Sequence, residues 1–268
     1  MICFPNAKIN LGLHVVRKRV DGYHDIETVF YPIPIYDALE ITEAEKFSFT
    51  QTGISLDNAP ENNLVVKAVQ LLSRQFDLPP FAMHLLKTIP VGAGLGGGSA
   101  DAAFGLRLVN EYCQLGLTDD ELKNIAAQLG ADCPFFVDNT PVFATGTGNI
   151  FGPVELSLKG YYLCLVKPDI FVSTPTAYSM VTPTTPAVSL KEITRKPIAE
   201  WRGQLVNDFE AGIFHLYPRI GEIKNKLYEA GALYAAMSGS GSAVFALFTT
   251  PTNLKSTFPT DSVWEKEL

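Results

Sequence analysis

Apolar and polar residues alternate near the start of the chain, which is the period of a β-strand. The apolar positions of the first strand are Ile9, Leu11, Leu13 and Val15. Asp21-Gly22 then indicates a turn, and residues 26–35 are rich in β-branched and aromatic side chains. Two more strands are expected around residues 39–41 and 47–50. The beginning of the chain is therefore predicted to consist of strands.

Further along the chain, apolar residues recur with the spacing of helices. Residues 63–76 and 99–112 are predicted helices, and residues 81–89 form a predicted strand between them. A third helix is expected over residues 118–129, because Thr118 and Glu121 form a capping box. Gly130 is the expected left-handed stop of that helix.

A second series of elements begins after Pro153. Residues 161–166 read as a strand, and residues 205–214 and 220–228 read as helices. Two further strands, 232–237 and 243–248, flank the segment 238–242. The stretch 173–197 is rich in threonine and proline and is predicted to be a long surface loop. We therefore expect an α+β protein of two domains, residues 1–152 and 153–268.

Composition narrows the possible partners. The formal net charge of −7 argues against a nucleic-acid partner, although a single phosphate pocket is compatible with it. The first residues lack a signal peptide, and no apolar run approaches the ~20 residues that span a membrane. A soluble, cytoplasmic protein without a membrane partner is expected. Reduced thiols are expected at Cys3, Cys113, Cys133 and Cys164.

A glycine-rich segment carries the chemistry. Five of the seven residues 92–98 are glycine, between a predicted strand and a predicted helix. Glycine allows a ligand to approach the backbone closely, and successive N–H groups can then converge on an anion. The helix that follows adds its positive N-terminal end. Strand, glycine loop and helix together indicate a site for a triphosphate.

Two other kinds of segment, a linker and another nucleotide-binding loop, fit these residues less well. A flexible linker is disfavoured because the flanks are apolar and structured. Gly92, Gly94 and Gly97 satisfy the dinucleotide pattern, but no acidic residue at the end of a predicted strand follows at about 20 positions to hold a ribose. Ser99 stands where a P-loop requires lysine, and the triplets of protein kinases are missing from the sequence.

For three further features, residue type alone leaves two roles possible. Lys8 in an apolar strand is either an edge residue with its ammonium group in solvent, which is the commoner case, or a buried functional cation. Asp132 is either a base in an apolar environment or a turn residue. The segment 238–242 is either a hairpin turn or a second source of N–H donors.

Taken in order, these segments resemble the GHMP kinases over nearly the whole chain. The first motif contains Lys8, the second is the glycine loop, and the third covers residues 237–248. Within the superfamily the sequence is most similar to the members that act on a cytidine diphosphate-linked methylerythritol. The segments specific to them are Asp21-Gly22-Tyr23-His24 and Gly130-Ala131-Asp132; Asn207-Asp208-Phe209-Glu210 also matches. Ala100 and Ala243 depart from the pattern, because a hydroxyl residue is common there.

The resemblance implies a fold and a reaction. The N-terminal domain would be ribosomal-protein-like and bind ATP, the C-terminal domain ferredoxin-like, and the active site would lie in the cleft between them. ATP would phosphorylate the 2-hydroxyl of 4-diphosphocytidyl-2-C-methyl-D-erythritol in the non-mevalonate isoprenoid pathway. Mg²⁺ would accompany ATP, held mainly by phosphates and water, with no protein ligand assigned. A monomer or weak homodimer is expected.

The resemblance also implies site residues. The catalytic pair is Asp132, as the base, and Lys8, which orients the hydroxyl and offsets charge. Tyr23 would stack on cytosine and His24 would read its edge. The full substrate set is Asn10, Tyr23, His24, Thr176 and Tyr178. The ATP set is Pro90, Val91, Gly92, Ala93, Gly94, Leu95, Gly96, Gly97, Gly98, Ser99, Ala100, Asn63 and Lys87.

Three alternatives remain beside this expectation. The nearest is a GHMP kinase for mevalonate, phosphomevalonate or homoserine, which the segment 21–24 disfavours because those substrates carry no base. A non-catalytic sensor with this fold is disfavoured by the presence of Lys8 and Asp132. A nicotinamide oxidoreductase is more distant still.

Overall fold

The computed structural model describes residues 1–55 and 60–268, which form an α+β protein. Contacts divide the chain into two compact units. Unit 1 contains Met1–Ala7, Ile35–Val91 and Gly96–Thr140, and unit 2 contains Lys8–Pro34, Gly92–Leu95 and Pro141–Leu268. The domain boundary at residues 152–153 and the cleft between domains stay predictions.

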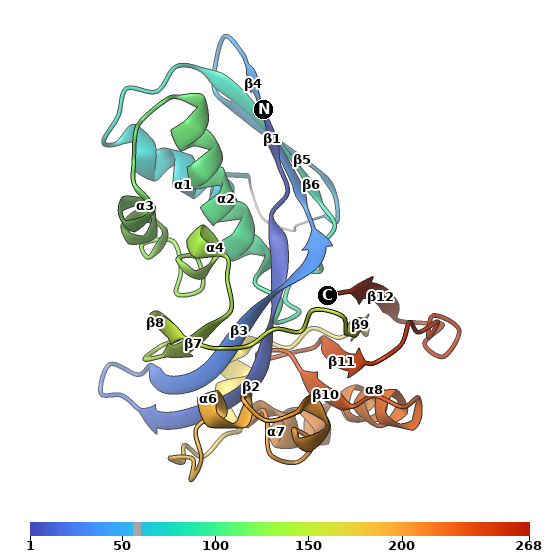
Figure 1. Ribbon diagram of the computed structural model, residues 1–268. Helices are drawn as coiled ribbons and strands as arrows, with labels where there is room; N and C mark the ends of the chain where they lie inside the picture. The colour runs from blue at the N-terminus through green and yellow to red at the C-terminus, as the bar shows by residue number, and fades with distance from the viewer. Residues whose placement is uncertain (56–59) are drawn as a thin grey trace. The chain divides into compact units, whose positions relative to one another are not determined.

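Unit 1 is one sheet with helices against it (Figure 1). The strand order is β1 (Ile2–Cys3), β4 (Ala38–Glu43), β6 (Phe81–Lys87) and β5 (Ser48–Gly53), and only β5 and β6 are parallel. Helix α2 (Gly97–Tyr112) packs on β1 and β4, and α1 (Leu64–Ser73) packs on α2. The unit also contains η1 (Pro60–Asn62), α3 (Asp119–Ala126) and α4 (Phe135–Asp138).

Unit 2 contains most of one sheet and all of another. The first sheet has the order β2 (Asn6–Lys18), β3 (His24–Tyr36), β7 (Val142–Thr145) and β8 (Ile150–Pro153). The second is antiparallel, in the order β10 (Tyr234–Met237), β11 (Val244–Phe248), β9 (Tyr162–Lys167) and β12 (Ser262–Glu267). Helix α8 (Pro218–Glu229) covers β10 and β11. The remaining helices are α5 (Thr174–Ser179), α6 (Leu190–Ile193), η2 (Ile198–Glu200) and α7 (Phe209–Leu216).

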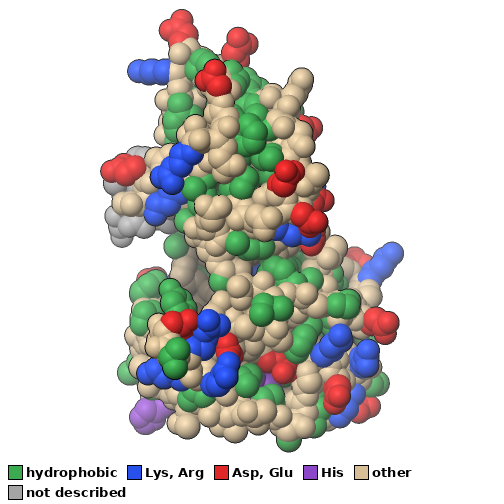
Figure 2. All heavy atoms as spheres, turned by 90° about the vertical axis from the view of Figure 1, so that its left-hand side faces the viewer, with side chains coloured by type: hydrophobic (Ala, Val, Ile, Leu, Met, Phe, Trp, Pro, Cys, Tyr) green, Lys and Arg blue, Asp and Glu red, His purple; other side chains and the backbone are tan. Residues whose placement is uncertain are grey.

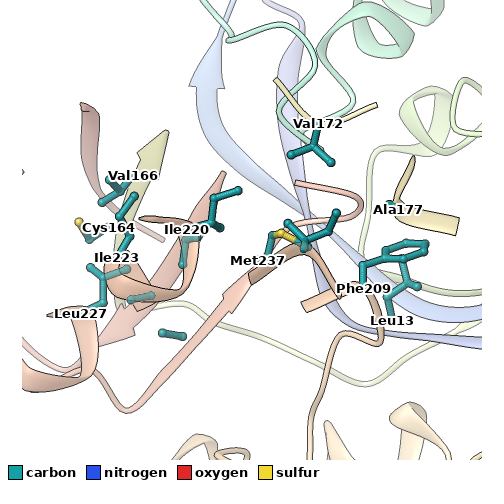
Figure 3. Close-up of a cluster of buried hydrophobic side chains, with 14 of the residues drawn as sticks. Leu13, Cys164, Val166, Val172, Ala177, Phe209, Ile220, Ile223, Leu227 and Met237 are labelled. Atoms are coloured by element: carbon teal, nitrogen blue, oxygen red, sulfur yellow. The ribbon is translucent and has the colours of Figure 1, made fainter. Parts of the chain in front are cut away.

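The core of unit 2 joins its two sheets through apolar side chains (Figure 3). Leu13 comes from β2, Cys164 from β9 and Phe209 from α7, and all three are buried in one cluster. Burial raises the pKa of the Cys164 thiol to about 12, so this cysteine is a neutral, apolar core residue. The cysteines that the structure describes form no disulfide, as expected.

Several predicted elements are confirmed, and some are wrong. The capping box of α3 is present, because Thr118 N donates to Glu121 Oε2 at 2.8 Å and Glu121 N donates to Thr118 Oγ1. That helix ends at Ala126, however, and Gly130 does not adopt a positive φ, so the predicted left-handed stop is wrong. The predicted long loop 173–197 is also wrong, since it contains α5 and α6, each capped by a serine side chain.

Basic and acidic side chains are interspersed over the face shown in Figure 2. Surface charges also pair in the structure, as Arg17 does with Asp25 and Arg19 with Asp21. Within residues 1–55 and 60–268, no helix is both long and apolar enough to cross a membrane.

Candidate functional site

The glycine loop adopts a backbone that requires glycine. Gly92, Gly94 and Gly96 have φ values of +62°, +76° and +69°, a region that other residues rarely occupy. A Cβ atom on Gly94 would lie 1.9 Å from the carbonyl oxygen of Ser238, so a side chain is excluded there. The sequence therefore places glycine where both the dihedral angles and the neighbours demand it.

Helix α2 begins inside this loop, two residues earlier than predicted. Its N-cap is Gly96 and its first residue is Gly97. The first N–H groups of a helix have no acceptor within the helix, and a glycine cap supplies no side-chain oxygen. These donors, together with the positive end of the helix, suit the oxygen atoms of a phosphate group.

The first half of the loop, Gly92–Leu95, is fixed to the rest of unit 2 by its carbonyl groups. The oxygen of Ala93 accepts from Ala243 N at 3.2 Å. Gly94 O accepts from Ser238 Oγ at 2.8 Å, and Leu95 O accepts from Lys8 N at 2.9 Å. Three consecutive carbonyl oxygens are thus bound by protein. Because these oxygens are already engaged, the N–H groups of the loop are better suited than its oxygens to face an anion.

The segment 238–242 is the hairpin connection between β10 and β11, and it also lies against the glycine loop. Its role as a second source of N–H donors stays a prediction. Ser238 Oγ also accepts from Asn10 N at 3.2 Å, so one hydroxyl joins β2 to the loop. Asn207 Nδ2 donates to Met237 O and Gly239 O, both at 2.8 Å, and so holds the start of the segment. Sequence reasoning did not assign Ser238 a side-chain role, although its glycine–serine surroundings marked the segment.

Lys8 is a buried cation, so the alternative of an edge residue with its ammonium group in solvent is wrong. Its exposed fraction is 4%, and Nζ donates to Asn10 Oδ1 at 2.6 Å. The ammonium also lies 4.6 Å from the centroid of the Phe30 ring. Asn10 in turn donates to Thr28 Oγ1 at 3.0 Å, which fixes the amide that receives the lysine. A buried ammonium in a fixed orientation is suited to stabilising negative charge on a bound group.

Asp132 belongs to unit 1 and lies in the turn between α3 and α4. Its side chain is half-buried, and buried residues follow it from Cys133 to Val137. Burial, assisted by the negative charge of Asp132, raises the pKa of the Cys133 thiol to about 11 and keeps it neutral. Lys8 belongs to unit 2, and its approach to Asp132 stays a prediction.

The residues predicted to bind the substrate partly come together in unit 2. The rings of His24 and Tyr178 stack with centroids 4.6 Å apart and an interplanar angle of 19°. Tyr178 also meets Phe209 edge-on at 4.9 Å. Tyr23 is 67% exposed, and its backbone N–H donates to Asp21 Oδ1, as in a turn. Ser173 caps α5, because its Oγ accepts from Thr176 N at 3.2 Å and lies 2.6 Å from Thr176 Oγ1, and Tyr178 is on the same short helix.

Phe171 is a residue that the sequence did not indicate. It is 69% exposed, and a Cβ on Gly92 would come within 2.6 Å of its ring. Only the absence of a side chain at Gly92 lets this ring lie there, and no local pattern in the sequence predicts such a contact.

The two remaining ATP candidates are both in unit 1. Asn63 is the N-cap of α1, where its Oδ1 accepts from Val65 N and its Nδ2 donates to Gln51. Lys87 is only 2% exposed and is paired with Asp37 and Asp101. Its ammonium is engaged by protein, and a direct contact with nucleotide stays a prediction. No group of three metal-ligating His, Cys, Asp or Glu side chains occurs in the described part of the chain.

Comparison with known proteins adds to this geometry. The N-terminal domain of GHMP kinases matches residues 63–144, and the C-terminal domain matches residues 189–257. A 4-diphosphocytidyl-2-C-methyl-D-erythritol kinase of Parabacteroides distasonis is 64% identical, with 100% of both chains aligned.

Solved structures agree in fold. The crystal structure of a 4-(cytidine 5'-diphospho)-2C-methyl-D-erythritol kinase matches with a TM-score of 0.84 at 31% identity. That match covers 99% of this chain and 98% of the other. Mevalonate kinase of Methanococcus jannaschii matches with a TM-score of 0.72 at 15% identity, covering 99% and 96%. At that identity the likeness concerns the fold alone.

Proposed function

Because the chain belongs to the GHMP kinases, and within them to the family of 4-diphosphocytidyl-2-C-methyl-D-erythritol kinases, we propose that it phosphorylates that compound. In this reaction the 2-hydroxyl receives the γ-phosphoryl group of ATP, which gives the 2-phosphate and ADP. The observation that carries the proposal is the 64% identity to one such kinase over both full lengths.

ATP is proposed to bind with its phosphates at the glycine loop and the start of α2. The φ values of Gly92, Gly94 and Gly96 and the bound carbonyl oxygens of Ala93 to Leu95 support this placement. Mg²⁺ enters as its complex with ATP, and phosphate oxygens and water are its main ligands. We propose a cytoplasmic enzyme that acts as a monomer or weak homodimer.

The transfer itself needs a base, a positioned hydroxyl and charge compensation. Asp132 is proposed to accept the hydroxyl proton as the acceptor oxygen bonds to the γ-phosphorus and the bond to the β–γ bridging oxygen breaks. Lys8 is proposed to orient the hydroxyl and to offset charge on the transferred group. Its burial and its hydrogen bond to Asn10 support this role, because they hold the ammonium in one direction.

The cytosine base is proposed to bind beside Tyr23, His24 and Tyr178. The stacked pair of His24 and Tyr178 supports this, because it provides a flat aromatic surface next to an exposed tyrosine. Asn10 and Thr176 are proposed to contact the rest of the substrate.

One assay tests the proposal. Purified protein with Mg-ATP is given the cytidyl compound, mevalonate or homoserine in separate reactions, and ADP release is measured. ADP should form at a high rate only with the cytidyl compound. Equal turnover of mevalonate would show that the chain is a GHMP kinase with another acceptor, and ATP binding without any turnover would favour a sensor.

A further inference from the structure

A buried cation in unit 1 is shared by two carboxyl groups. The Lys87 ammonium, at the end of β6, donates to Asp37 Oδ2 and to Asp101 Oδ2, the latter at 2.7 Å. The side chains of Lys87, Asp37 and Asp101 are 2%, 0% and 4% exposed. We call these three residues the Lys87 cluster. If all three were ionised, one negative charge would be buried without compensation, which is costly.

The two carboxyl groups of the cluster are not equivalent. Asp37 Oδ1 accepts from Thr88 N at 2.5 Å and from Ile89 N at 2.8 Å, so both of its oxygens are bonded as those of an anion. Asp101 Oδ1 is buried and has no hydrogen-bond partner among the described residues. Because an anion with an unbonded buried oxygen is the less stable of the two, a proton shared within the cluster belongs on Asp101.

The electrostatic environment of Asp101 agrees with this assignment. Burial, together with the negative charge of Asp37, raises the pKa of Asp101 to about 7, although Lys87 acts in the opposite direction. Cys3 on β1 is also influenced by the charge of Asp101, and burial, assisted by Asp101 and Glu111, raises the pKa of its thiol to about 12. Asp101 is therefore the group that changes charge near neutral pH.

The cluster lies directly beneath the start of α2. A Cβ on Gly97, the first residue of that helix, would come within 2.9 Å of Lys87 Nζ and 2.8 Å of Ile89. Asp101 is on the same helix, about one turn further along. The cluster thus connects the end of β6 to the part of α2 whose N–H groups suit a phosphate.

We propose that the Lys87 cluster is a positioning group for the phosphates of ATP, and that loss of its shared proton weakens ATP binding. This inference rests on the proposed function. With the proton in place, the cluster is neutral and holds the start of α2 on β6. Once Asp101 ionises, a second carboxylate charge lies next to the start of α2 and repels the phosphates of the nucleotide.

The test compares the wild type with Asp101→Asn, which resembles the protonated carboxyl in shape and cannot ionise. The dissociation constant of Mg-ATP is measured by calorimetry, without acceptor, from about pH 6 to about pH 9. The two proteins should bind alike at the low end. At the high end, the variant should bind about threefold to tenfold more tightly than the wild type. Parallel curves would overturn the proposal.

Further variants separate positioning from general stability. Asp101→Ala should bind Mg-ATP more weakly than Asp101→Asn at every pH, because it loses the bond to Lys87. Lys87→Met should weaken binding about tenfold or more. Lys123→Met, which removes a partly exposed lysine paired with Asp120 and Asp138, is the matched control and should bind normally.

The outcomes of these binding measurements distinguish the positioning role from the proposed function. If Lys87→Met does not fold, the comparison of wild type with Asp101→Asn still decides the question. Equal binding by Asp101→Ala and Asp101→Asn would also overturn the positioning role. Failure of the wild type itself to bind Mg-ATP would overturn the proposed function and this role together, whereas binding with parallel curves overturns this role alone.

Discussion

The Ser238 hydroxyl donates a hydrogen bond of 2.8 Å to the carbonyl oxygen of Gly94. Ser238 Oγ also accepts from Asn10 N, so a single serine fixes the glycine loop relative to β2. Removing it would leave a buried acceptor and a buried donor without partners, which typically costs ~1–3 kcal/mol. The glycine loop would then no longer be held in one position relative to β2.

Ser238→Ala is therefore expected to raise the dissociation constant of Mg-ATP by about fivefold to a hundredfold. Calorimetry on the purified variant measures this. Ser240→Ala is the matched control, since Ser240 lies in the same segment, is partly exposed, and has its Oγ 3.4 Å from Thr174 Oγ1. Equal affinities for both variants would mean that Ser238 does not position the loop.

Asp132→Asn tests the base. It should lower kcat by roughly 10²–10⁴ while ATP binding is largely kept, because a carboxamide cannot accept the proton. Steady-state kinetics and calorimetry together provide the measurement. Asp138→Asn serves as the control, because Asp138 is an exposed partner of Lys123. A kcat within a few-fold of the wild type would remove Asp132 from this role.

Lys8→Met tests the buried ammonium of β2. Activity should fall sharply, since the side-chain length is kept while the charge is lost. Lys18→Met, at the exposed end of the same strand, should remain active. In a structure of the enzyme with both substrates, Lys8 Nζ should lie within ~4 Å of the Asp132 carboxylate. Side chains that face different cavities would refute the pairing.

Gly96→Val tests the phosphate loop. The variant should stay folded but lose ATP binding, because a branched side chain is strained at φ +69° and would fill the space needed by phosphate. Gly116→Val carries the same kind of strain, at φ +71°, with no atom within 4 Å of the added Cβ. Calorimetry of both variants, with circular dichroism to check folding, distinguishes loop chemistry from backbone strain. Unchanged affinity in Gly96→Val would place the nucleotide elsewhere.

Base selection can be measured with a uridine analogue of the substrate. Stacking tolerates any base, whereas hydrogen bonds to the base edge can discriminate by up to ~10⁴. Tyr23→Ala should therefore weaken the cytidine substrate and keep the preference over uridine, because His24 would still read the edge. The measurement is kcat/KM for both substrates in wild type and variant. A ratio near one in the wild type would mean that residues 21–24 only form a turn.

Much of the fold could be predicted because its causes are local. The capping box at Thr118 acts within a few residues, and it is present. Short strands such as β1 and β7 were missed, because two or four residues carry no period. Helix α7 begins at Phe209, later than predicted, because the backbone of residues 206–208 bonds to Leu13 of β2: Leu13 N donates to Val206 O, and Asp208 N donates to Leu13 O.

In the candidate site, too, features with local causes could be predicted and contacts between distant residues could not. The glycine loop is a local requirement and was found from sequence. Asp37 and Asp101 were not found, because Asp37 meets Lys87 across 50 positions of the chain and its importance depends on burial. The contact of Ser238 with Gly94 spans 144 positions. Residue type alone also favoured a solvent-exposed Lys8, because lysine is rarely buried. In the structure β2 is buried on both faces, and Lys8 is therefore buried with it.

The glycine loop also determines how this protein can be divided. Its residues Gly92–Leu95 belong to unit 2, while Val91 and Gly96 on either side belong to unit 1, so the chain changes units twice within it. No single cut can release either unit as an intact fragment. A split-protein pair or a circular permutant would keep the loop whole only if new ends were placed elsewhere, for example at the exposed turn around Gly203.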